Sequence, residues 1–224
     1  GKSWIIPRTP VFSLTTQQLD SVPAYVDLRE PQIFQHGQIR ALVDPRRLEY
    51  GVPVRSDLLV LQLLKDNLGT RPLYIARTTG GYLQALGLEP YGLIQGLATK
   101  IMPVPVVTRG DTIAVPGYGH LDMPRSVALW NGYGAPGAIV RRGDWVDRPS
   151  VGIPVTYVAT ALLLGDAYER QGKPAEAERV RRRGVEIAQA TRTLDLFVGQ
   201  GRAVPSPNAP AGDVPRGVPI PARP

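Results

Sequence analysis

The sequence predicts an α+β protein with a small mixed α/β body and a C-terminal antiparallel helical hairpin. Three observations lead there. A helix, a buried strand and another apolar segment follow one another in the first half, two segments with helical apolar spacing follow residue 155, and both ends lack periodicity. We expect an extended N-terminal arm (1–31), an α+β body with Gly/Pro-rich loops (32–154), the hairpin (155–198) and a Pro-rich arm (199–224).

The composition limits the size of the core and the kinds of site and partner that the chain can have. The 224 residues are 43% hydrophobic, enough for one ordinary core or two small ones, and 24 glycines with 23 prolines predict many turns. The net charge of +7 favours an anionic partner. The lack of cysteine excludes disulfides, thiolate metal sites and cysteine nucleophiles. No apolar run reaches the ~18–20 residues that span a bilayer. The start at Gly1 indicates a processed form or a fragment.

In the first half, Thr15 is placed to cap a short helix, and residues 38–43 form a strand within the extended stretch 32–47. The clearest helix covers residues 57–67. Ser56 is its expected N-cap, and Gly69 supplies the left-handed exit.

A short buried strand over 73–76 comes next, and we expect a second helix from about Pro90 to Met102. Residues 103–154 are rich in glycine and proline. They predict loops that wrap the body, with short strands over 104–107 and 112–115.

The hairpin is predicted as helices over 156–171 and from Pro174 to about Leu196, separated by a break at Gly172. Small residues at the contact allow close packing, and Glu178 lies four residues before Arg182, the spacing of a helical ion pair. The two facing sets are Tyr157, Ala161, Leu164 and Tyr168 on one helix and Ala177, Val180, Gly184, Ile187 and Ala188 on the other.

Residue types that carry catalysis are sparse. The only histidines are His36 and His120, too few for an obvious metal site, and Asp111 and Asp122 flank His120 as an acid–base alternative to an ordinary loop histidine. The glycine turns at 79–82 and 117–120 lack the strand–loop–helix context of phosphate loops. We therefore expect no enzyme, no cofactor and no metal.

Two resemblances involve the second half and the body. Residues 164–168 (Leu-Gly-Asp-Ala-Tyr), Gly172 and 175–177 (Ala-Glu-Ala) resemble a tetratricopeptide helix pair in a single copy. A longer resemblance spans roughly residues 30–190 and rests on the segments 55–57, 65–67, 71–74, 91–98 and 147–151.

That longer pattern is similar to the soluble C-terminal part of a bacterial family of multi-span, mannosyltransferase-like membrane proteins of unknown function. The resemblance implies a location outside the membrane and in the periplasm, not an activity. A soluble remnant of this kind also resembles the extrinsic subunits of bacterial photosynthetic reaction-centre–light-harvesting complexes.

Partner-binding residues are expected in three places. Arg179, Arg182 and Arg183 form the densest basic cluster, for which a solvated helix face is the alternative to a contact with an acidic partner or anionic lipid head groups. Trp130 and Trp145 are expected to cover the body. The remaining candidates lie in the arms: Trp4, Ile5, Ile6, Arg202, Pro205, Pro207, Pro210, Pro215, Arg216, Pro219 and Pro221.

Together these features predict a non-enzymatic, membrane-extrinsic structural subunit that binds integral-membrane protein subunits, with the arms as straps across neighbours. Nucleic acid is not expected, because no basic platform interleaved with aromatic residues is present. The alternative is a ligand- or partner-binding extracytoplasmic domain of a sugar-transferring membrane protein, with a deep pocket near His120 and Trp130.

Overall fold

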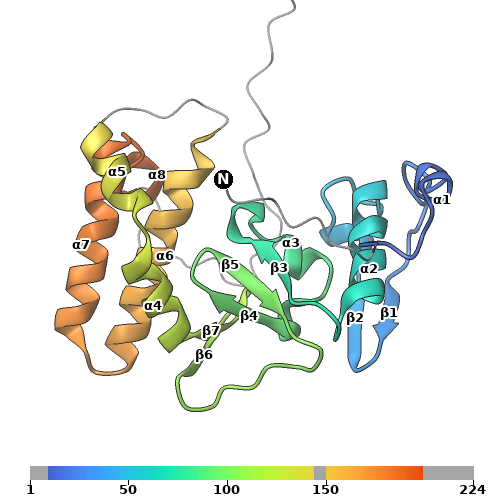
Figure 1. Ribbon diagram of the computed structural model, residues 1–224, viewed down its shortest axis with the longest axis horizontal. Helices are drawn as coiled ribbons and strands as arrows, with labels where there is room; N and C mark the ends of the chain where they lie inside the picture. Colours follow the sequence, from blue (N-terminus) through green and yellow to red (C-terminus); the bar gives the residue numbers. More distant parts are fainter. Residues whose placement is uncertain (1–9, 144–149, 199–224) are drawn as a thin grey trace, which may run out of the picture.

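A five-stranded mixed sheet lies between a helical hairpin and a smaller module built from a strand pair and a helix (Figure 1). The computed structural model describes residues 10–143 and 150–198. The predicted α+β class and the C-terminal helical hairpin are confirmed. In the described part of the chain, no helix is both long and apolar enough to cross a membrane.

The strand order of the sheet is β3-β5-β4-β7-β6, and all neighbours are antiparallel except the parallel pair β4–β7. One buried cluster joins the sheet to the hairpin, and a second joins it to the smaller module. The strands are β3 (Leu73–Ala76), β4 (Gly92–Gln95), β5 (Ala98–Ile101), β6 (Thr112–Val115) and β7 (Gly119–Asp122).

The helix predicted from Pro90 to Met102 is wrong. A 3-10 turn, η3 (Glu89–Tyr91), leads into the hairpin of β4 and β5. Gly96 turns the hairpin with a φ of +64°, and a side chain at Gly92 would lie 2.6 Å from Leu83 Cδ2. Burial alternates along both strands, which a short apolar run does not reveal in the sequence.

The smaller module pairs β1 (Gln32–His36) with β2 (Ile39–Val43), so the strand predicted over 38–43 is confirmed and has its partner within the same stretch. Helix α2 (Arg55–Asn67) packs beside it. Ser56 is not the cap, because the helix begins at Arg55, two residues before the predicted start; Val54 is the N-cap residue, and the Asp57 carboxylate accepts its N–H at 2.9 Å. The 3-10 turn η1 (Pro45–Arg47) lies between β2 and α2, and the 3-10 turn η2 (Arg77–Thr79) and the short helix α3 (Tyr82–Ala85) follow β3.

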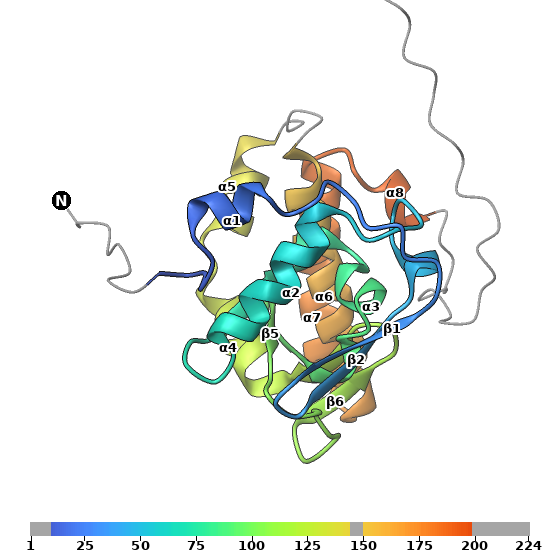
Figure 2. The ribbon, with the colours of Figure 1, turned by 90° about the vertical axis from the view of Figure 1, so that its right-hand side faces the viewer.

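The described part of the N-terminal arm lies on the chain's own α2 (Figure 2). Ser13 donates to the Asp66 carboxylate through its backbone N–H at 2.7 Å and its hydroxyl at 2.8 Å. The predicted cap at Thr15 is confirmed, because Thr15 and Gln18 form a reciprocal capping box at the start of α1 (Thr16–Asp20). Val11 and Ser13 of the arm are therefore hydrogen-bonded to α2 of the same chain.

Two helices replace part of the loops predicted over 103–154, namely α4 (Met123–Gly132) and α5 (Ala135–Arg142). Asp122 caps α4 by accepting the Arg125 N–H at 3.1 Å. The glycines at 132, 134 and 137 do not interrupt these two helices, because none of them adopts the positive φ of a turn. The strand over 112–115 is confirmed, whereas residues 104–107 form no strand.

The hairpin consists of α6 (Gly152–Arg170) and α7 (Pro174–Ala190), and the short α8 (Asp195–Val198) follows. Both predicted facing sets are buried, and Arg182 lies 3.5 Å from Glu178. Helix α7 ends before the predicted Leu196 because Arg192 takes a φ of 55° and the Thr193 N–H bonds back to Ala188 O.

Two glycines set the separation of α6 and α7. A Cβ on Gly184 would lie 2.8 Å from the Ala161 Cβ, and a Cβ on Gly165 would lie 2.7 Å from the Arg181 side chain. Arg181 crosses α6 at that point and pairs with Glu169 and with Asp166, whose Oδ1 is 2.5 Å away. The bonds to Glu169 and then Asp166 raise the pKa of Arg181 above its usual value.

We expect Gly184→Ala to lower the free energy of unfolding by about 1–3 kcal/mol, because the new methyl group forces two helix backbones apart. The matched control is Gly132→Ala, at an exposed helical position with nothing within 4 Å. This control should leave stability unchanged or raise it by up to about 1 kcal/mol. Urea unfolding followed by circular dichroism measures both, and equal effects would contradict the close contact.

Candidate partner-binding groove

A groove of about 390 Å³ lies where α4 and α5 meet α7, and its lining includes the three arginines of the predicted basic cluster, Arg179, Arg182 and Arg183. Three arginines and one glutamate line it, so its rim is net positive. We call this feature the arginine groove. Its lining residues are Trp130, Asn131, Tyr133, Pro136, Arg179, Val180, Arg182, Arg183 and Glu186.

Aromatic rings form the inner wall of the arginine groove. Trp130 lies 6.5 Å from Tyr157 of α6 between ring centroids, and Tyr133 meets the same ring edge-on at 5.8 Å. The Tyr133 hydroxyl accepts the Leu97 N–H at 3.3 Å. Because the rings are anchored to both α6 and the sheet, the wall is fixed before any ligand arrives.

The rim arginines differ in their partners. Arg183 pairs with Glu186 at 2.9 Å, and Arg182 forms a mostly exposed pair with Glu178. Arg179 is exposed and has no ion-pair partner in the described part of the chain. An exposed pair contributes only ~0–1 kcal/mol, so an incoming carboxylate can compete for these guanidinium groups.

A fourth arginine, Arg141 of α5, lies beside this cluster, and no local sequence pattern indicates it. The guanidinium groups of Arg141 and Arg183 both lie 3.3 Å from the point where Gly137 would carry a Cβ. Glycine at 137 therefore leaves room for two like charges to lie over the start of α5. The second guanidinium group adds to the positive charge beside Arg183 and so favours a bound anion there.

The other predicted sites fall elsewhere. Trp4, Ile5 and Ile6 lie outside the described residues. So do Trp145 and the C-terminal set, which is Arg202, Pro205, Pro207, Pro210, Pro215, Arg216, Pro219 and Pro221. Trp130, expected to cover the body, does so and also lines the arginine groove.

His120 is not a loop residue, and it is not among the residues that line the groove beside Trp130. It lies on β7, and its Nδ1 is buried without a hydrogen-bond partner among the described residues. Asp122 accepts Gln95 Nε2 at 2.9 Å and the Arg125 N–H, so the acid–base pair considered from the sequence does not form. Within residues 10–143 and 150–198, no three His, Asp or Glu side chains gather as metal ligands.

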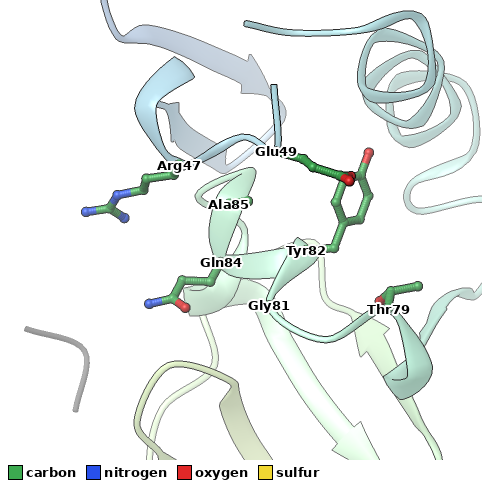
Figure 3. Close-up of a pocket in the computed structure, with 7 residues that line it drawn as sticks. All are labelled: Arg47, Glu49, Thr79, Gly81, Tyr82, Gln84 and Ala85. Carbon is green, nitrogen blue, oxygen red and sulfur yellow. The ribbon is translucent and has the colours of Figure 1, made fainter. Parts of the chain in front are cut away.

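A wider cavity of about 520 Å³ lies between the β1–β2 module and α3 (Figure 3). Tyr82 lines it and donates its hydroxyl to Asp57 Oδ1 at 2.8 Å. Burial, followed by the bond to Asp57, raises the pKa of Tyr82 far above its ordinary value. The hydroxyl is therefore a structural donor, and Arg47 points away from it (Figure 3).

We expect Tyr82→Phe to lower the free energy of unfolding by about 1–2 kcal/mol, because buried Asp57 loses one of its two donors. Tyr25→Phe is the matched control, since Tyr25 is 64% exposed. It should change stability by less than about 0.5 kcal/mol. If urea unfolding gave the same value for both variants, the Tyr82–Asp57 bond would not hold α3 to α2.

Comparison of the chain with protein-family models, curated protein sequences and solved structures finds no match. The resemblance to the multi-span membrane family and to reaction-centre extrinsic subunits therefore stays a prediction from the sequence. The arginine groove and the cavity beside α3 are the features of the described residues from which function is argued next.

Proposed function

We propose that this chain is a non-enzymatic, membrane-extrinsic structural subunit that docks on an integral-membrane complex and stabilises it. Its arginine groove receives an acidic segment of a protein subunit of that complex. One observation carries the proposal: the three arginines of the predicted basic cluster on α7 line a groove with a fixed aromatic wall and a net positive rim.

The chemistry of the arginine groove favours a protein segment over lipid head groups. Arginine and large aromatic side chains dominate the binding energy of protein interfaces. A guanidinium group binds a carboxylate through two parallel hydrogen bonds, which fixes orientation as well as affinity. A lipid surface would be met by a broad flat basic patch, whereas here the basic residues surround a concave wall.

The membrane setting of the proposal comes from the sequence resemblance. It implies a periplasmic location, peripheral to the membrane, and a photosynthetic reaction-centre–light-harvesting complex as the assembly. In this proposal the arms over 1–9 and 199–224 would extend the interface. The alternative function, a ligand- or partner-binding extracytoplasmic domain of a sugar-transferring membrane protein, is favoured by the cavity of about 520 Å³ beside α3.

The test is binding of the purified chain to native membranes that have been washed free of extrinsic proteins. We expect saturable binding, and we expect Arg179→Glu combined with Arg182→Glu to weaken it by about tenfold or more, since two attractive contacts become repulsive. The matched control combines Arg40→Glu with Arg109→Glu, which changes the net charge equally at two exposed arginines away from the groove.

Protein-free vesicles made from lipids of the same membranes separate the two classes of partner. The proposal predicts weak binding to these vesicles and loss of membrane binding after protease treatment of the membranes. Equal binding to membranes and vesicles would replace the protein partner with anionic lipid. An equal loss in both charge-reversal variants would show that net charge, and not the groove, drives attachment.

A further inference from the structure

Arg77 lines a partly open cavity of about 290 Å³ between the sheet and α6. Arg77 opens the 3-10 turn η2 after β3, and its backbone is fixed because its N–H donates to Leu97 O at 3.0 Å. The turn at Gly117 and Tyr118 and the first turns of α6 form the opposite walls. This cavity does not overlap the arginine groove.

Arg77 is poorly compensated where it lies. Its Nη1 donates to Thr160 Oγ1 at 2.7 Å, and that hydroxyl donates in turn to Thr156 O at 2.7 Å. A guanidinium group has five N–H donors, and no carboxylate pairs with this one in the described part of the chain. Burial lowers the pKa of Arg77.

A cation removed from water without a counter-charge is costly, and a bound anion removes that cost. The surroundings add to the attraction. Gly152 and Val155, in the first turn of the 19-residue α6, line the cavity, and a helix N-terminus carries partial positive charge. The hydroxyl-bearing residues Thr78 and Thr79 line it as well. No acidic residue is among the lining residues.

We propose that this cavity binds a small organic oxyanion, a carboxylate or a phosphate monoester, through the guanidinium group of Arg77. The anion would pair with the donors that Thr160 leaves unused. Apolar lining from Ile75, Val155 and Ala159 accommodates a short hydrocarbon portion, and the volume admits only a small molecule. The site is independent of partner docking and gives the chain a ligand beyond its proposed structural role.

The test is an NMR titration of the full chain at constant ionic strength with four probes: butyrate, butyramide, acetate and methyl phosphate. We expect butyrate to shift the resonances of Thr160 and Val155, and butyramide, which has the same size without the charge, to leave them unmoved. Acetate should bind more weakly than butyrate, because it lacks the apolar portion. Comparing butyrate with methyl phosphate shows which anion class the site prefers.

Two variants and one control complete the experiment. Arg77→Met should abolish the shifts. Thr160→Val should weaken binding measurably, by at most about tenfold, since it removes the group that positions Nη1. Arg40→Met, the same substitution at an exposed strand arginine, should bind as the unaltered chain does. Should Arg77→Met fail to fold, Thr160→Val still decides. Unchanged affinity in Thr160→Val, or equal binding of butyramide and butyrate, would overturn the proposal.

Discussion

The burial of α6 is the constraint on which the rest of the structure depends. This helix is covered by α7 on one side, by α4 and α5 on another and by the η2 turn on a third. A helix that is apolar around most of its circumference must be covered in this way. The close approach at Gly184 allows α7 to pack on α6, and the Trp130–Tyr157 contact packs α4 on it. Both proposed sites depend on α6, through Tyr157 in one and Thr160 in the other.

How far the sequence predicts this fold depends on which signals are local. The hairpin faces and α2 were predictable, because helical periodicity and end signals lie within each segment. Helices α4 and α5 were missed because glycines at 132, 134 and 137 resemble loop residues although their backbone angles are ordinary. The hairpin of β4 and β5 was mistaken for a helix because its burial pattern depends on neighbours that are distant in the sequence.

In the candidate sites, too, local signals were readable from the sequence and tertiary contacts were not. Arginine density pointed to Arg179, Arg182 and Arg183, but nothing local places Trp130 beside them, since α4 and α7 meet only through tertiary packing. Arg141 and Arg77 had no sequence signal. Each is a single arginine whose role depends on its tertiary surroundings: a second guanidinium group beside Gly137 for Arg141, and a partly open cavity for Arg77.

The central claim is that the arginine groove contacts a protein of the membrane complex. The most direct measurement places a photo-crosslinking amino acid at Asn131, in the groove, and in a separate variant at Arg40, an exposed position on strand β2. After illumination of intact cells, mass spectrometry identifies the crosslinked peptide. We expect the Asn131 variant to crosslink to an acidic segment of one integral-membrane subunit and the Arg40 variant to give no such product. Identical products from both positions, or none from Asn131, would contradict the claim.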